Sequence, residues 1–292
     1  MKKMLLAYKS YLSDSCAENT VHSYMGDLTK FIKDCGIKTK KDVQKLKSDT
    51  VNEYVQSLRN SGASYSSVLR SVASLKKFFG YCLSEGIIKK DPTIEVETPR
   101  VQRKLPDTMT DEDVVLLLEA PDCNTLKGIR DRAMLELMYA TGARVSELIA
   151  LKTGDVSLKN EVIVLTTGKK SRFVPMGRVA IETLYKYLQD CRPLMATEQS
   201  GDTFFLNFYG EPLSRQGFWK IVKSYIEKCK LNPGITPQTL RHSFALHLLK
   251  NGADTQSVSE MLGYRDVSST KIYLEVLNNR IRDIYKKSHP RA

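Results

Sequence analysis

A proline-containing stretch, residues 89–110, divides this 292-residue chain into two regions of different pattern. Its prolines are Pro92, Pro99 and Pro106. Proline removes a backbone N–H and disfavours a helical conformation in the residue before it, and the apolar residues here show no helical period. We therefore predict an extended linker at 98–107, in agreement with the two domains that the chain length favours. The predicted domains span residues 1–97 and 108–292.

The first hundred residues predict helices and no strands. The helical segments are expected at 20–36, 48–62 and 64–86. In the last of these, apolar residues recur at steps of four and three, which places them on one face of a helix. The opposite face carries Arg70, Ser74 and Lys77. Such a face is commonly only solvated; the alternative is a helix laid along a DNA groove, where small residues permit close approach.

The region after the linker predicts helices together with a small sheet. A capped helix is expected to begin at Thr110, and a largely apolar helix should end at Gly142. Two β-branched runs flank Gly168 within residues 161–176, which predicts a β-hairpin. The segments that follow again have mostly helical patterns. We therefore predict a mainly α protein whose second domain is α+β with a small antiparallel sheet.

The positive charge of the chain is spread evenly. There are 45 Lys and Arg against 33 Asp and Glu, a formal charge of +12, and each of the two regions 1–100 and 101–292 carries +6. A basic tail would concentrate the charge in one block, so this distribution indicates a polyanion-facing surface on both domains. Charge alone does not establish such a surface, because many basic proteins never contact nucleic acid.

The six cysteines and four histidines show no spacing typical of a disulfide framework or a zinc site. They predict a reducing compartment and no metal. The N-terminus lacks the apolar core of a signal peptide, and no run approaches about 18 apolar residues. We expect a soluble intracellular protein with no membrane association.

Arg144 and Glu147 are the charged residues of an otherwise apolar stretch that follows Gly142. Charged side chains are seldom buried unless they are paired or bound to something. Three residues apart in the opening turn of a helix, the two project from nearly the same side. A guanidinium held by a carboxylate at a helix start is suited to binding phosphate. The alternative is a surface Arg–Glu pair, which contributes little.

A second helix start carries Gln238 and Arg241 on one face of its first turn. Thr236 is a suitable N-cap, and Pro237 suits the first helical position. We expect Arg241 to point outward, where an anion would bind. The predicted hairpin tip adds Gly168-Lys169-Lys170, which can extend an ammonium toward the same anion. These groups together predict an oxyanion-binding site.

Tyr273 lies between two apolar residues on a short helix. A tyrosine in such a position usually belongs to a core. To act as a nucleophile, its phenol would need a nearby cationic cluster, because the ordinary pKa of tyrosine is about 10.

Three long motifs occur in order along the second region: TGARVSEL, LRHSFALHLLKNGAD and SSTKIYLEV. With them, this region resembles the tyrosine recombinase (phage integrase) family. The segment SYSSVLRSVASLKKFFGYCLSEGIIKKDPT and the ending SHPRA extend the similarity over nearly the whole chain, which resembles the Xer branch of that family. The resemblance implies an all-helical, SAM-like core-binding domain, a catalytic domain, and a C-terminal exchange helix at about 279–290 that docks into a neighbouring protomer.

The resemblance also implies roles for individual residues. Arg144 and Arg241 would bind the scissile phosphate, and Glu147 would brace the site. Lys169 would protonate the departing 5′ oxygen, with Lys170 as a rival because this turn is short. Tyr273 would attack phosphorus and form a 3′-phosphotyrosine link. One phosphodiester is exchanged for another and fixed cationic donors meet the transition-state charge, so we expect no ATP, no metal and no other cofactor.

Two positions depart from the family pattern. Relatives commonly have histidine where Gln238 stands, and histidine or tryptophan where Tyr264 stands. Glutamine cannot accept the proton of tyrosine at neutral pH, whereas a phenol at position 264 still donates a hydrogen bond. General acid–base help is worth about 10²–10⁴-fold, so we expect slower cleavage rather than none. His242 points about 100° away from Arg241 around the helix, and we do not expect it to substitute.

The partner implied by the resemblance is duplex DNA with an inverted-repeat site, bound by four protomers that are identical or shared with a related recombinase. An accessory protein or a DNA translocase is a further candidate partner. Additional DNA contacts are predicted at Arg70, Ser74, Lys77, Lys170, Arg172 and Arg215. We expect a cytoplasmic, nucleoid-associated protein that resolves chromosome or plasmid dimers or moves a mobile element. The alternatives are a DNA-binding relative that has lost catalysis and a type IB topoisomerase.

Overall fold

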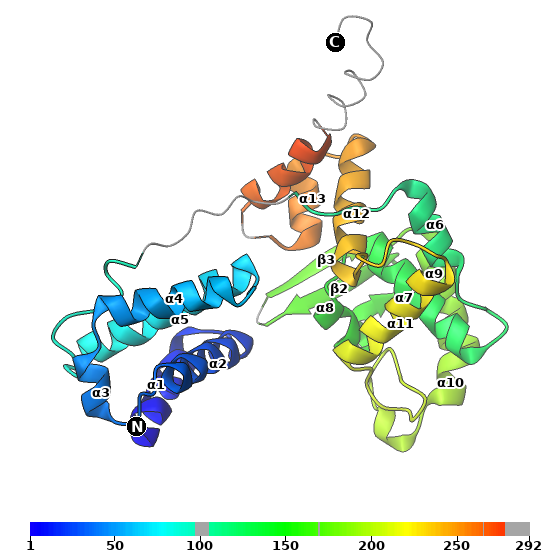
Figure 1. Cartoon of the computed structure of the whole chain (residues 1–292). Helices are drawn as coiled ribbons and strands as arrows, with labels where there is room; N and C mark the ends of the chain where they lie inside the picture. Colours follow the sequence, from blue (N-terminus) through cyan, green and yellow to red (C-terminus); the bar gives the residue numbers. More distant parts are fainter. Residues whose placement is uncertain (97–104, 169, 265, 278–292) are drawn as a thin grey trace, which may run out of the picture. The chain divides into compact units, whose positions relative to one another are not determined.

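The computed structural model describes residues 1–96, 105–168, 170–264 and 266–277 (Figure 1). Contacts within the chain divide it into two compact units, residues 1–102 and 103–292, and each is described by itself. The division falls inside the predicted linker, 98–107, most of which lies outside the described residues. The predicted exchange helix at 279–290 also lies outside them.

The described part of the first unit is built of helices, as predicted. The helices are α1 (Lys2–Ser15), α2 (Glu18–Asp34), α3 (Lys40–Lys45), α4 (Ser48–Asn60) and α5 (Tyr65–Ser84). The second helix begins two residues before the predicted start. The core of this first unit is rich in aromatic rings, with Phe31 and Phe79 in edge-to-face contact between α2 and α5. The predicted apolar face of α5 is buried in this core.

The opposite face of α5 is less exposed than the helical period predicts. Ser74 is fully buried, and its hydroxyl donates a hydrogen bond of 2.9 Å to the Tyr24 carbonyl of α2. The predicted position of Ser74 on a DNA-facing surface is therefore wrong, because α2 packs along this side of α5 as well. Arg70 pairs with Asp27 at 2.8 and 3.0 Å. The Lys77 ammonium lies 5.4 Å from the centre of the Tyr11 ring.

The second unit combines helices with a small sheet, as predicted. Its helices are α6 (Asp111–Glu119), α7 (Leu126–Thr141), α8 (Val145–Ile149), α9 (Arg178–Lys186), α10 (Arg192–Met195), α11 (Arg215–Lys228), α12 (Pro237–Lys250) and α13 (Thr255–Leu262), followed by helical residues 268–277. Short 3₁₀ turns occupy Thr153–Asp155 and Glu198–Ser200, and a π turn occupies Tyr187–Cys191. Thr110 caps α6 by accepting the Asp113 backbone N–H.

The sheet has three antiparallel strands in the order β1 (Val156–Ser157), β2 (Val162–Thr167) and β3 (Lys170–Pro175). The predicted hairpin is formed by β2 and β3, paired from Val162 with Pro175 to Thr167 with Lys170. Ile163, Leu165 and Val174 are buried on the inner face of the sheet. Lys169, at the tip, lies outside the described residues.

Gly142 ends α7 in the left-handed conformation, with a φ of 58°. A Cβ at this position would lie 2.4 Å from Cδ1 of Phe244, so glycine lets the end of α7 lie directly against α12. The next residues begin α8, with Arg144 as its N-cap. The glycine thus brings the first predicted motif against the helix that carries the second.

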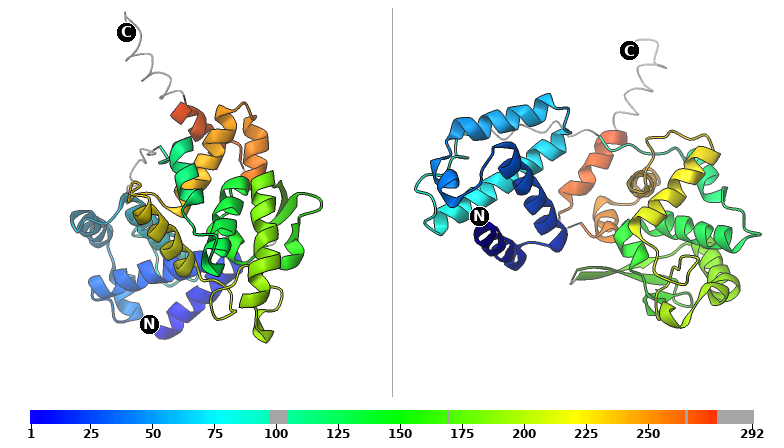
Figure 2. Two further views of the ribbon diagram at one scale, coloured as in Figure 1. Left: turned by 90° about the vertical axis from the view of Figure 1, so that its right-hand side faces the viewer. Right: turned by 60° about the horizontal axis from the view of Figure 1, so that its bottom comes forward.

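A separate hydrophobic cluster joins α12, α13 and the helical residues 268–277. Figure 2 shows these segments, in orange and red, gathered in one bundle. Leu246, Leu262 and Tyr273 are buried in it. Among the helices of the described residues, none is both long and apolar enough to cross a bilayer.

Candidate active site

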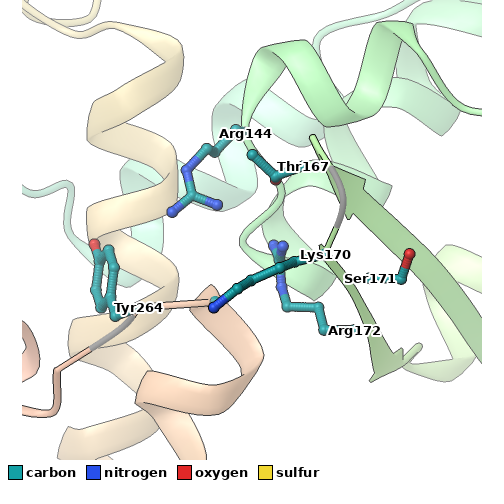
Figure 3. A pocket seen from close by; sticks show the side chains of 7 residues that line it. Arg144, Thr167, Lys170, Ser171, Arg172 and Tyr264 are labelled. Carbon is teal, nitrogen blue, oxygen red and sulfur yellow. The ribbon is translucent and has the colours of Figure 1, made fainter. Parts of the chain in front are cut away.

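The segments singled out in the second unit converge on a cavity of about 420 Å³ (Figure 3). It is lined by Arg144, Thr167, Lys170, Ser171, Arg172, Gly263 and Tyr264. These residues come from the start of α8, from the β2–β3 hairpin and from the turn after α13. In Figure 3 the Lys170 side chain extends across the cavity toward Tyr264, whereas Ser171 points to the other side of the strand.

The Glu147 carboxylate organises one wall of this cavity. One of its oxygens, Oε2, accepts the backbone N–H of Arg144 at 2.7 Å, and Oε1 accepts Nη1 of the Arg144 side chain at 2.9 Å. The hydroxyl of Thr167 donates to the same Oε1. Only 1% of the Glu147 side chain is exposed. The predicted pair therefore joins a buried carboxylate to a partly exposed guanidinium, and is not a pair between two solvent-exposed side chains.

Arg172 is the second cation on Glu147. Its Nη1 and Nη2 donate to the two carboxylate oxygens at 2.6 and 2.9 Å, and its Nε donates to the Met261 carbonyl at 2.6 Å. Arg172, predicted as a DNA contact, thus holds the Glu147 carboxylate in place, a role that the sequence did not predict. The period of two along β3 is the signal that relates it to Lys170, because alternate strand residues share a face.

The ionisation of Glu147 follows from these bonds. Burial on its own would raise the pKa of the carboxyl, but hydrogen bonds from Arg172, the Arg144 backbone and Thr167 outweigh it. They hold the pKa at about 2, well below its ordinary range. Glu147 is therefore an anion at neutral pH. One negative charge shared by two guanidiniums leaves this wall of the cavity positive.

Arg241 points inward, which corrects the prediction that it points outward. It is buried, its Nη1 donates to the Gly142 carbonyl, and its Nη2 donates to the Leu262 carbonyl at 2.6 Å. Its position in the second turn of α12 faces the packed ends of α7 and α13 rather than solvent. The guanidinium lies 5.4 Å from the Tyr264 ring centre, and that ring lines the cavity. Burial and then the charge of Arg144 lower the pKa of Arg241.

Gln238 lies on the first turn of α12, as predicted, behind the N-cap Thr236. It is exposed and lines a second cavity of about 420 Å³ together with Arg144 and Arg215. Arg144 therefore borders both cavities. Arg215, predicted as a DNA contact, is exposed at the start of α11.

Tyr273 is buried, with 1% of its surface exposed. Its hydroxyl lies 2.7 Å from Nδ1 of His242 and 3.1 Å from the hydroxyl of Tyr264. Burial, and then the hydrogen bond with Tyr264, raise its pKa well above the ordinary value, and the charge of Arg241 opposes this. The hydroxyl thus sits directly behind Tyr264, a lining residue of the first cavity.

His242, which is not expected from the sequence to substitute for an imidazole at position 238, contacts the Tyr273 hydroxyl. The residue does point away from the outer face of Gln238, but the helical residues 268–277 pack on that side of α12 and bring Tyr273 to it. The helical period of the sequence gives the angle of His242 around α12, but it does not give the segment that packs there. In the sequence, the position of His242 directly after Arg241 in the motif RHSF was the signal that it lies near the site.

Gly263 lets the turn before Tyr264 lie directly against the Arg172 side chain. Its φ is 64°, and a Cβ would lie 3.0 Å from Nη1 of Arg172.

Within residues 1–96, 105–168, 170–264 and 266–277, no group of three or more His, Cys, Asp or Glu side chains is arranged to hold a metal ion. The site is a cationic cavity whose charge suits an oxyanion, with a phenol hydroxyl behind one wall.

Two family patterns match the chain. Residues 107–280 match the Phage integrase family, and residues 5–86 match the SAM-like N-terminal domain of phage integrases. A tyrosine recombinase XerD of Staphylococcus haemolyticus is 42% identical over 277 residues, which are 94% of each chain. A tyrosine recombinase XerD of Listeria monocytogenes is 43% identical over 277 residues, which are 94% of this chain and 93% of that protein.

Solved structures with the same fold include DNA complexes. The XerH site-specific recombinase bound to palindromic difH substrate superposes with a TM-score of 0.77 at 21% identity, covering 97% of this chain and 88% of that one. A lambda integrase dimer bound to a COC′ core site gives a TM-score of 0.73 at 17% identity, covering 94% of each chain. At such low identity, these likenesses concern the fold alone.

Proposed function

Because the chain belongs to the phage integrase family and is an Xer-type tyrosine site-specific recombinase, we propose that it cuts and rejoins an inverted-repeat DNA duplex through a covalent 3′-phosphotyrosine intermediate. The family was predicted from the three motifs, and that prediction is confirmed. DNA cleavage and rejoining is the activity of such enzymes. What we propose here is the role of each residue, the target site and the assembly.

One observation carries the assignment of roles. The Tyr273 hydroxyl contacts Tyr264 at 3.1 Å, and the Tyr264 ring lies against Arg241 and lines the cavity that Arg144 borders. Three motifs spread over residues 141–276 thus supply two guanidiniums and one phenol to a single site. That combination fits attack of a hydroxyl on a phosphodiester.

We assign phosphate binding to Arg144 and Arg241. The charge of Arg144 disfavours the charged form of Arg241, and a bound phosphate would offset this repulsion. Glu147 and Arg172 would hold Arg144 in place. The leaving 5′ oxygen would be protonated from the hairpin, by Lys169 or by Lys170.

The nucleophile has to move before it can react. The Tyr273 hydroxyl is buried behind Tyr264, so the attack requires the helical residues 268–277 to shift when DNA or a neighbouring protomer binds. We propose that the segment 279–290 of a neighbouring protomer makes the contact that shifts these residues. Burial of an uncharged phenol would then keep the enzyme inactive away from its site.

The assembly that we propose contains four protomers on two DNA sites. The XerH and lambda integrase structures are of DNA complexes, and the lambda protein is a dimer on its site. The partner protomers are identical chains or a related recombinase, and an accessory protein or a DNA translocase would activate them. The exposed residues Arg70 and Arg215 and the half-buried Lys77 are proposed as contacts to the DNA backbone. The reaction would take place in the cytoplasm, on the nucleoid.

The test begins with the target site, mapped by footprinting and by sequencing the junctions that the protein makes. A duplex of that site, nicked so that a short strand escapes after cleavage, then traps the covalent intermediate. We expect an SDS-resistant complex with the wild-type protein and none with Tyr273→Phe, while the gel shift persists. A wild-type protein that binds the site without forming an adduct would contradict the proposal, and relaxation of plasmids lacking the site would indicate a topoisomerase.

A further inference from the structure

We propose that His242 accepts the proton of Tyr273 when its phenol oxygen attacks the scissile phosphate. The inference rests on the proposed function and adds a residue to it. In the buried arrangement of Tyr273, the Nδ1 atom of His242 lies 2.7 Å from the Tyr273 hydroxyl, and the inference requires that this hydrogen bond is kept when the helical residues 268–277 shift.

The structure gives that hydroxyl two partners of different chemistry. Tyr264 offers a phenol oxygen at 3.1 Å, which is a poor proton acceptor near neutral pH. His242 offers a ring nitrogen at the shorter distance, and the unprotonated nitrogen of a neutral imidazole accepts protons readily at this pH. Of the two, His242 is therefore the group able to act as a base.

Gln238 does not compete for this role. It lies on the exposed side of α12, in the second cavity with Arg144 and Arg215. Its amide has no basic nitrogen, so it serves phosphate binding through a hydrogen bond and leaves the proton to another group. The buried side of the same helix supplies that group in His242.

The surroundings of His242 keep it in the accepting form. Burial and then the positive charge of Arg241, its neighbour on α12, lower its pKa, so the imidazole is neutral at pH 7. Asp107, from the segment before α6, acts in the opposite direction and stabilises the imidazolium that proton transfer creates. Tyr273, on the helical residues 268–277 that face His242, is uncharged because burial raises its pKa.

The step balances without any further reactant. As the bond from the Tyr273 oxygen to phosphorus forms, its O–H bond breaks and the proton passes to Nδ1 of His242. The bond from phosphorus to the 5′ oxygen breaks, and that oxygen takes a proton from the hairpin lysine. In rejoining, the 5′ hydroxyl attacks the phosphotyrosine and returns its proton to the hairpin lysine, the bond from phosphorus to the Tyr273 oxygen breaks, and that oxygen recovers its proton from His242.

The test uses a matched pair of substitutions on α12, His242→Asn and His247→Asn. His247 makes the same kind of contact, from Nδ1 to the hydroxyl of Tyr139 at 2.9 Å, away from the cavity. Asparagine places an amide oxygen near the Nδ1 position, which keeps the hydrogen bond but removes the basic nitrogen. The rate of covalent complex formation is measured from pH 6 to 9 on the nicked duplex, and on the same duplex with sulfur in place of the bridging 5′ oxygen, whose departure needs no proton.

We expect His242→Asn to slow adduct formation by about 10²–10⁴-fold at pH 7 on both duplexes, with a rate that rises about tenfold per pH unit. We expect His247→Asn to cleave like the wild type. Wild-type rates in His242→Asn would overturn the inference, and so would recovery on the sulfur duplex, which would assign the proton to the leaving group. If the asparagine variant fails to bind DNA, His242→Gln is measured in its place. No adduct from the wild type on either duplex would instead overturn the proposed function.

Discussion

The Glu147 carboxylate accepts hydrogen bonds from both terminal guanidinium nitrogens of Arg172, at 2.6 and 2.9 Å. The same carboxylate holds the side chain and the backbone N–H of Arg144. A strand residue and a helix N-cap are thereby fixed to each other through one buried anion. The position of the proposed phosphate-binding arginine depends on this bridge.

We expect Glu147→Gln to destabilise the second unit by about 3 kcal/mol, because it leaves two guanidiniums without their buried partner. Urea unfolding at pH 7 measures this loss. Glu182→Gln is the control, since Glu182 forms an exposed pair with Arg178 that contributes little. Equal losses in the two variants would show that the bridge has no special contribution.

Glu147 also makes stability depend on pH. Its pKa in the folded protein is about 2, against an ordinary value of 4.5. A lowered pKa stabilises the fold above the unfolded value, and this contribution is lost as pH falls from about 4.5 to 2. The wild type should therefore lose stability steeply in that window, while Glu147→Gln should show a flatter profile. Unfolding free energies measured every half pH unit test the difference.

Arg172 should act through Glu147 rather than on DNA. We expect Arg172→Lys to slow cleavage by about 10- to 100-fold, because a lysine cannot make the two-pronged bond. The dependence of DNA affinity on salt should stay unchanged. Arg215→Ala is the comparison. If Arg215 contacts a phosphate, the plot of log binding constant against log salt concentration should become less steep by about 1. A less steep salt dependence in Arg172→Lys would instead show that Arg172 contacts the DNA directly.

Gln238→His should raise the cleavage rate, within the limit of about 10²-fold, because an imidazole at the phosphate adds a group that can transfer protons. Single-turnover cleavage of the nicked duplex is the measurement. Arg144 borders the same cavity, so phosphate binding should change little. A slower variant would mean that the amide has a positive role.

Gly142→Ala should destabilise the second unit by about 2–4 kcal/mol, because the new methyl would require a left-handed backbone and would clash with Phe244. Gly168→Ala is the matched control, with a φ of 61° but no atom within 4 Å of the added Cβ. It should cost about 1 kcal/mol. Thermal unfolding distinguishes the two, and equal losses would contradict the close approach of α7 and α12.

Features that depend on neighbouring residues could be predicted from the sequence. Thr110 and Thr236 cap their helices, and the β-branched runs around Gly168 form the hairpin. The pairing of Arg144 with Glu147 was predicted too, since three residues in a helical turn place both side chains together. Caps, turns and one-turn pairs are governed by local geometry, which the order of residues specifies.

The sequence by itself determined the helices, the hairpin, the family and the candidate residues of the site. The tertiary structure decided where those residues point: Arg241 faces inward, Ser74 is covered by α2, and His242 meets Tyr273. The reason is physical. Helical spacing gives the angles between side chains on one helix, but the environment at each angle depends on which distant segment packs there, and that is decided by burial of the whole core.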